Sequence, residues 1–164
     1  VIMRPTSIWG PWFGPTYRGF FELILKRRYF NYTGKMATKT YGYIGNTIYQ
    51  IDRLLKADDN HGKTFYLGDY KPTKIKEWAQ EIGGEINYSV INIPRSIIWC
   101  SAKVGDFLKQ YDIKFPMNSY RYNNMLTDSV MPLEETRKYA PDLPYDRIEG
   151  NRLTIKWMFD YYLK

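Results

Sequence analysis

The sequence is poor in the side chains that bind metals and form disulfides. Its 164 residues include one cysteine, Cys100, and one histidine, His61. A single cysteine excludes an internal disulfide framework and a thiolate-clustered metal site. Apolar runs are short as well, since none approaches the roughly 18 residues that a membrane-spanning helix needs. We therefore expect a protein with no metal site and no membrane partner, in a reducing, cytoplasmic compartment.

Aromatic residues and positive charge are present in excess. Aromatic side chains make up 18% of the chain, and 24 Lys and Arg outnumber 17 Asp and Glu to give a net charge of +7. A chain this rich in apolar and aromatic residues is not disordered. A positive surplus fits nucleic acid, an anionic membrane surface or phosphorylated small molecules as partners. Because the basic residues form no single stripe, nucleic acid is not favoured.

Strand-like and helical patterns alternate along the chain, which predicts an α/β fold. Strands are expected at 1–9, 29–33, 40–44, 64–67 and 88–93. Helices are expected at 16–26, 46–55, 73–83, 94–110, 133–139 and 150–163. In the helix over 46–55, Ile48, Ile51 and Leu55 recur at helical spacing and are expected to face the core. In the helix over 73–83, the apolar stripe consists of Ile75, Trp78, Ala79 and Ile82.

The glycine-rich segment near the start of the chain does not fit a dinucleotide-binding loop. Gly10 and Gly14 have the wrong spacing for that motif. Pro11 and Pro15 also remove backbone N–H groups that such a loop would offer to a pyrophosphate. The segment is therefore interpreted as a structural loop.

Candidate catalytic residues fail a similar test. Tyr70 and Lys74 have the spacing of a proton relay, but Pro72 lies between them, so they would not share a helical face. Cys100 is expected to be a buried structural thiol, and His61 lies in a predicted turn without other ligands near it. The sequence therefore predicts no catalytic residue and no metal ligand.

Four segments, in order, resemble a known family. They are Arg4-Pro5-Thr6-Ser7-Ile8-Trp9-Gly10-Pro11, Lys39-Thr40-Tyr41-Gly42-Tyr43-Ile44-Gly45-Asn46, Phe65-Tyr66-Leu67-Gly68-Asp69-Tyr70-Lys71-Pro72-Thr73 with Glu77, and the stretch from Asp128 through Ile148-Glu149-Gly150 to Thr154 and Trp157. Together they are similar to motifs of the extended short-chain dehydrogenase/reductases, the NAD-dependent nucleotide-sugar epimerases and dehydratases.

The resemblance implies the C-terminal part of a Rossmann-like parallel sheet plus a small mixed α/β substrate-binding lobe. Ranges 1–14 and 62–72 would form sheet strands and loops, and the remainder of 1–164 would form mostly the lobe. In this family the glycine-rich NAD loop and the Tyr-x-x-x-Lys relay precede the Arg-Pro strand, so we expect a C-terminal piece that is inactive alone. Its expected partners are the missing N-terminal half and further copies of itself. Without that half, Ile2, Ile8 and the strand over 65–67 would expose apolar surface and promote self-association.

The resemblance also implies roles for particular residues. Thr6 falls where the family's main chain approaches the nicotinamide of NAD. Three residues fall at positions that contact the diphosphate of a nucleotide-diphosphate sugar, namely Ser7, Lys39 and Arg121. Three more fall on the strand beside the nucleotide base, namely Asn31, Tyr32 and Thr33.

Each of these roles has a structural alternative. Lys39 and Arg121 could be ordinary surface charges, and Tyr32 could be a core residue. For the whole chain, the alternative function is a non-catalytic basic module that binds nucleotides, RNA or a protein partner.

Overall fold

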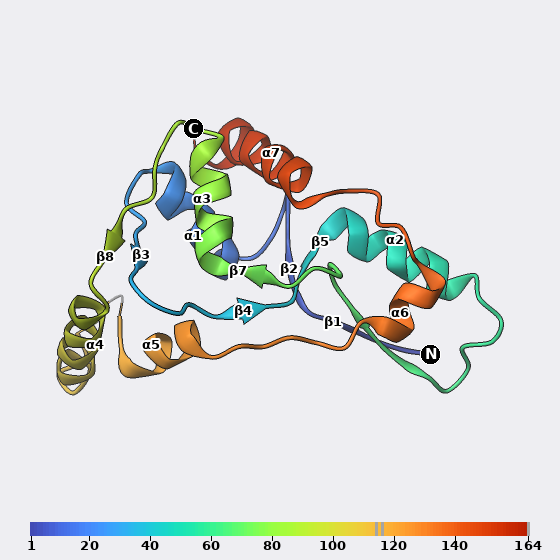
Figure 1. Cartoon of the computed structure of the whole chain (residues 1–164), viewed down its shortest axis with the longest axis horizontal. Helices are drawn as coiled ribbons and strands as arrows, with labels where there is room; N and C mark the ends of the chain where they lie inside the picture. The colour runs from blue at the N-terminus through green and yellow to red at the C-terminus, as the bar shows by residue number, and fades with distance from the viewer. Residues whose placement is uncertain (114, 116, 164) are drawn as a thin grey trace.

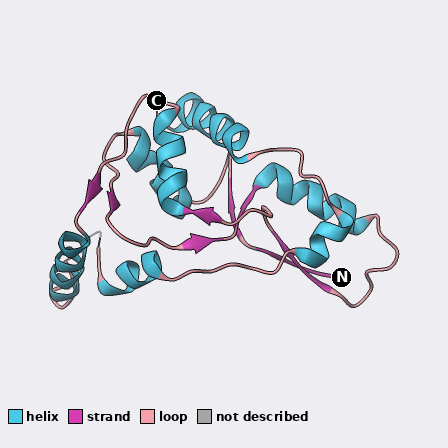
Figure 2. Ribbon diagram, viewed as in Figure 1, coloured by secondary structure: helices cyan, strands magenta, loops and turns pink. Residues whose placement is uncertain are grey.

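A computed structural model describes residues 1–113, 115 and 117–163, and residues 114, 116 and 164 lie outside the described part. Figure 1 shows the arrangement and Figure 2 the short strands among helices. The strands are β1 (Ile2–Pro5), β2 (Ser7–Trp9), β3 (Asn31–Tyr32), β4 (Thr38–Lys39), β5 (Tyr41–Tyr43), β6 (Thr64–Leu67), β7 (Thr73–Lys74) and β8 (Asn92–Ile93). The helices are α1 (Pro15–Leu25), α2 (Ile44–Leu55), α3 (Ile75–Gly84), α4 (Arg95–Lys109), α5 (Ser119–Leu126), α6 (Glu134–Tyr139), α7 (Arg147–Trp157) and the π-helical η1 (Met158–Tyr162).

The strands pair in twos, mostly in parallel. β1 pairs with β6, β2 with β5 and β3 with β8, all parallel, while β4 and β7 are antiparallel. Parallel pairs need long crossovers, and helices supply part of them here, for example α1 between the paired strands β2 and β5. The α/β, partial Rossmann-like fold class predicted from the sequence is confirmed.

The largest core is aromatic and lies between β2, α1, α3 and α7. Trp9 and Trp78 meet edge to face, with ring centroids 5.0 Å apart, and Phe21 stacks against Trp9 at 5.9 Å. Offset and edge-to-face rings attract one another beyond the gain from burial alone. This packing fixes α1 and α3 against β2 and β5, and the two helices then form walls of the cleft described below.

A second core lies between β6, α2 and α6, at the end of the molecule near the N-terminus (Figure 1). The sequence predicted that the strand at 64–67 would expose apolar surface. This is wrong for Phe65 and Leu67, which are 1% and 0% exposed because Leu54 and Tyr139 cover them. Ile2 of β1 is 54% exposed, as predicted.

Helix α2 buries its polar side. Asn46 and Gln50 are buried, whereas Ile48 and Leu55 are 59% and 68% exposed, so the predicted core-facing stripe is wrong. The reason is a set of directed hydrogen bonds. The Gln50 amide donates to the Gly68 carbonyl at 2.8 Å and accepts from the Gly68 N–H at 3.0 Å. Burial of a side-chain amide costs little free energy when both its NH2 group and its carbonyl oxygen are hydrogen-bonded.

Several other expectations need correction. Cys100 is exposed on α4 instead of buried, because α4 packs through a different side. The strands expected at 29–33 and 88–93 shorten to β3 and β8. Helix α5 was not predicted. None of the helices among the described residues combines the length and apolarity needed to cross a bilayer.

Candidate functional site

A cleft of about 680 Å³ opens between α1, α3 and α5, and we call it the aromatic cleft. Most of its walls are aromatic or apolar, and three polar side chains, Lys39, Arg121 and Asn124, lie on one side of the lining. Its lining residues are Pro15, Tyr17, Gly19, Phe20, Leu23, Tyr29, Met36, Ala37, Lys39, Tyr41, Ile75, Trp78, Met117, Tyr120, Arg121, Asn124 and Met125. An apolar cavity with a few polar groups is the usual form of a small-molecule site.

Lys39 reaches the cleft from β4. Its Nζ donates to the Asn124 Oδ1 at 2.8 Å, and burial lowers the pKa of the ammonium below its usual value. Among the described residues, no carboxylate lies within ion-pair distance of this Nζ. A partly desolvated cation with a neutral partner gains most from an anionic ligand.

Arg121 lies on α5, which forms the wall opposite α1. The helix begins after Asn118, whose Oδ1 accepts from the Arg121 N–H at 2.8 Å as an N-cap. The structure therefore brings Lys39 and Arg121, far apart in sequence, to one cleft. Asn124 comes from the same helix and was missed from the sequence. An Asn directly before a Ser-Tyr-Arg-Tyr run was the available signal for this helix.

Ser7 is not among the lining residues but is joined to one of them. The Tyr17 hydroxyl donates to the Ser7 Oγ at 2.6 Å, and Tyr17 lines the cleft. Thr6 lies between β1 and β2, and its Oγ1 is buried without a hydrogen-bond partner among the described residues. It sits against Gly68, where an added Cβ would come within 2.7 Å of Oγ1.

The three residues predicted to lie beside a nucleotide base are not among those lining the cleft. Tyr32 is fully buried in a small core, and its hydroxyl donates to the Met125 carbonyl at 2.9 Å. Burial raises the pKa of Tyr32 to about 12. Asn31 is buried as well, while the exposed Thr33 accepts from the Arg95 N–H at 3.3 Å. Of the three, Tyr32 bonds to α5, a helix that lines the cleft.

Two tyrosines of the cleft, Tyr29 and Tyr41, are held in their neutral form. Burial raises the pKa of Tyr29 and of Tyr41 well above the usual value for a phenol. A neutral phenol can donate one hydrogen bond and present an aromatic face, but it does not accept a proton near neutral pH. The cleft is therefore equipped to bind a ligand through ring contacts and cations.

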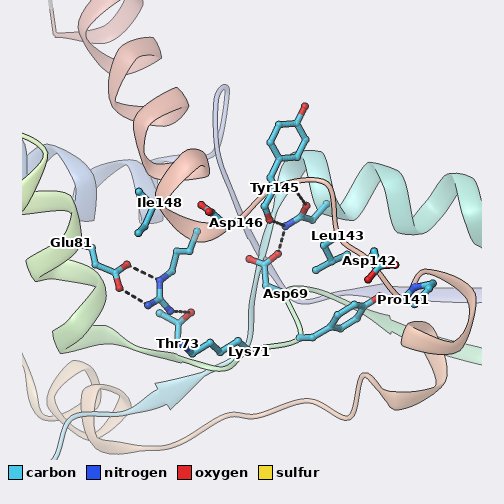
Figure 3. Close-up of a pocket in the computed structure, with 13 residues that line it drawn as sticks. Asp69, Lys71, Thr73, Glu81, Pro141, Asp142, Leu143, Tyr145, Asp146 and Ile148 are labelled. Carbon is cyan, nitrogen blue, oxygen red and sulfur yellow. Dashed lines mark hydrogen bonds and ion pairs between the residues drawn. The ribbon is translucent and has the colours of Figure 1, made fainter.

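A second cleft, of about 490 Å³, lies between α2, α3 and the start of α7, and we call it the polar cleft. Figure 3 shows Asp69 at its centre. The Asp69 carboxylate accepts from the Asn46 amide at 2.7 Å and from the Tyr43 N–H at 3.0 Å. Burial raises the pKa of Asp69, and these donors pull it in the opposite direction.

Arg147 supplies the positive charge of the polar cleft. Its guanidinium donates twice to Glu81, at 2.7 and 2.5 Å, and once to the Thr73 Oγ1 at 3.2 Å (Figure 3). The bond to Glu81 raises the pKa of Arg147. Bidentate pairing satisfies both charged groups within the protein. The Arg147–Glu81 pair therefore ties α7 to α3.

The loop between β2 and α1 does not fit the pyrophosphate of NAD. In this loop, the Phe13 N–H donates to the Gly10 carbonyl at 3.3 Å. Helix α1 begins at Pro15, which has no N–H. The rings of Trp12 and Phe13 pack against Trp157. Among the described residues there is also no group of three or more His, Cys, Asp or Glu side chains that could hold a metal ion.

Comparison with solved structures identifies the fold. A UDP-glucuronic acid 4-epimerase from Bacillus cereus in complex with NAD matches 99% of this chain and 43% of its own, with a TM-score of 0.67 and 11% identity. A UDP-glucose 4-epimerase from Thermotoga maritima with UDP-glucose matches 99% and 46%, with a TM-score of 0.62 and 14% identity. A human epimerase family protein with NADPH matches 93% and 46%, with a TM-score of 0.62 and 15% identity.

These matches show that the chain has part of the Rossmann-like fold found in NAD-dependent epimerases, as the sequence motifs predicted. The chain spans less than half the length of each of these three structures. No protein-family model and no curated protein sequence matches it.

Proposed function

We propose that this chain provides the nucleotide-diphosphate-sugar-binding part of an NAD-dependent epimerase or dehydratase. The aromatic cleft is the observation that carries the proposal. Its rings offer faces for a base and a sugar, while Lys39 and Arg121 offer charge to a diphosphate. Two of the similar solved structures are described with UDP-sugars or act on them by name.

The chemical step would be supplied by groups that these residues lack. Within the described residues, no glycine-rich NAD loop follows a strand and no helix carries a Tyr-x-x-x-Lys pair, and Tyr70 and Lys74 make other contacts. The Tyr70 hydroxyl donates to the Ala140 carbonyl, and Lys74 pairs with Glu77 at 2.9 Å. We therefore expect this chain alone to bind a nucleotide sugar without turning it over and to bind NAD weakly at most.

The open edge of β1 supports a further half of the sheet. Among the described residues β1 pairs with β6 alone, and its first residue, Ile2, is 54% exposed. Parallel strands are normally buried between neighbours and under helices. A Rossmann half placed against β1 would complete the sheet, and without it we expect self-association through this edge.

Calorimetric titration of the chain with UDP-glucose, UDP-glucuronic acid and NAD tests the proposal. We expect binding of at least one UDP-sugar, a loss of roughly tenfold or more for Lys39→Ala, and full or improved binding for Lys39→Arg. Each charge-assisted bond contributes about 1.5–3 kcal/mol, which sets that scale.

Lys74→Ala is the matched control. Lys74 lies on β7, beside β4 in the same two-stranded sheet, so its removal changes the net charge equally without touching the cleft. Equal losses for Lys39→Ala and Lys74→Ala would mean that overall charge, not the cleft, attracts the ligand. That outcome would favour the alternative of a basic module, as would RNA binding that Lys39→Ala leaves unchanged.

A further inference from the structure

Helix α4 is attached to the molecule through one narrow side. Its buried residues are Ile98, Ala102 and Gly105, which recur at helical spacing. A Cβ added to Gly105 would lie 1.7 Å from the Met117 carbonyl oxygen, so the helix backbone itself is in close contact there. The small residues Ala102 and Gly105 allow that approach. Several bulky residues of α4 lie on the other side.

The outward side of α4 carries a continuous apolar stripe. Ile97, Val104 and Phe107 are 53%, 50% and 57% exposed, and the exposed Cys100 lies between them at helical spacing. Tyr111 extends the stripe beyond the helix, with its ring centroid 5.3 Å from that of Phe107. Bulky apolar residues gathered in this way mark an interaction site more often than isolated ones do.

Positive charge borders the stripe. The Lys103 ammonium lies 5.8 Å from the ring centroid of Trp99, which is itself 49% exposed. The Arg95 guanidinium, at the start of α4, lies toward α5, where its Nε donates to the Tyr122 hydroxyl at 2.7 Å. Lys109 shares the helical side of Ala102 and Gly105, so the charge at the stripe is that of Lys103. Helix α4 has one acidic residue, Asp106. Its carboxylate accepts hydrogen bonds from the Ser119 N–H, at 3.0 Å, and from the Ser119 hydroxyl.

We propose that this face of α4 binds the surface of an anionic lipid bilayer. Apolar and aromatic residues would enter the interface while Lys103 meets lipid headgroups, which is how amphipathic surface helices bind membranes. Charge argues against a second copy as the occupant, since two such faces would bring lysines together on chains that each carry +7.

The position of α4 makes this surface independent of the sheet edge. The helix lies at the end of the molecule opposite β1 and the N-terminus (Figure 1), away from the edge at which a partner would complete the sheet. The sequence predicted no membrane partner, because its apolar runs are too short to span a bilayer, and it predicted that Cys100 is buried. The exposed face of α4 changes that expectation.

Binding to vesicles tests the proposal. The sole cysteine, Cys100, can carry an environment-sensitive fluorophore on the stripe of the otherwise unchanged chain. We expect a blue shift with vesicles of phosphatidylcholine and phosphatidylglycerol in equal parts, and little with phosphatidylcholine alone. In a sedimentation assay of unlabelled protein, Val104→Asp with Phe107→Asp should lower partitioning at least about tenfold, and Lys103→Gln about fivefold.

The control places the same change on α2. Ile48→Asp with Leu55→Asp alters side chains of similar exposure on a different helix and should leave binding unchanged. Lys103→Gln keeps the test valid if the double variant unfolds. Equal binding to both kinds of vesicle, or no effect of the α4 variants, would overturn the proposal. If the chain instead forms a concentration-dependent dimer that the α4 variants abolish, and does not bind vesicles, the partner of this face is a second copy of the chain and the bilayer proposal is overturned.

Discussion

In the polar cleft Arg147 is held by a carboxylate, whereas in the aromatic cleft Lys39 is held by a neutral amide. The Arg147 guanidinium makes two short bonds to Glu81, and its pKa is raised. The Lys39 ammonium donates to Asn124, and its pKa is lowered by burial. The two cations are therefore stabilised to different degrees by their own protein.

This difference separates a structural charge from one that is available to a ligand. A cation paired with a carboxylate within the protein has little to gain from an external anion. Burial of a cation without a countercharge disfavours its charged form and lowers its pKa. An anionic ligand offsets that cost. The comparison predicts that Arg147 matters mostly for stability and Lys39 mostly for binding.

The largest expected effect is on stability, from Arg147. Arg147→Met should lower the free energy of unfolding by about 2–3 kcal/mol, because it leaves the half-buried Glu81 without its charged partner. Denaturant titration measures the change. Arg152→Met is the control, because the Arg152–Glu85 pair joins the same two helices with an arginine that is 66% exposed, and it should cost less than about 1 kcal/mol. Equal losses would remove the distinction between the two pairs.

Asp69 should have the next largest effect. Asp69→Asn is expected to cost about 1–3 kcal/mol, since the Asn46 amide and the Tyr43 N–H donate to different carboxylate oxygens, and an amide has one acceptor oxygen. Asp142→Asn, an exposed change in the same cleft, should be nearly neutral. An Asp69→Asn protein as stable as the parent would show that these bonds are not needed.

The pH dependence of Asp69 provides a second measurement. Its folded-state pKa is raised above the unfolded value, so the folded state binds more protons between the two pKa values. The stability contributed by this group is present at low pH and lost as pH rises through the folded pKa. The parent should lose stability over that acidic range, and Asp69→Asn should remove this part of the dependence.

The smallest expected effect on stability is that of Lys39. Lys39→Met should change the unfolding free energy by less than about 0.5 kcal/mol at neutral pH, because the lost bond to Asn124 is offset by the removal of a desolvated charge. The lowered pKa means that the folded state binds fewer protons, so parent stability should rise with pH between the folded and unfolded pKa values. Lys39→Met should lack that rise. A large loss at neutral pH would make Lys39 a structural residue.

Local hydrophobic patterns predicted α3 well and α2 poorly. In α3 the apolar residues Trp78, Ala79 and Ile82 are indeed the buried ones. In α2 the pattern fails because Gln50 is buried by bonds to the backbone of Gly68, which lies on a different element. A hydrophobic pattern carries no information about such tertiary partners.

The candidate site was predictable in part. Motif resemblance selected Lys39 and Arg121, which line the same cleft, although their role stays a prediction. It did not select Asn124, because that residue belongs to no motif and reaches Lys39 only through the placement of α5. The exposed face of α4 was missed because it depends on Gly105, and a hydrophobicity pattern gives no weight to close backbone packing.

The parallel pairing of the strands has a consequence for how fast the chain folds. Ile2 pairs with Thr64 and Asn31 with Asn92, so each pair must close a long loop before it gains any hydrogen bond. Chains dominated by such distant contacts fold slowly, in the range of roughly milliseconds to seconds, compared with helical proteins. We expect helical signal to develop before the tryptophans of β2 and α3 come together. Refolding followed by circular dichroism and by tryptophan emission should then give two separate rates.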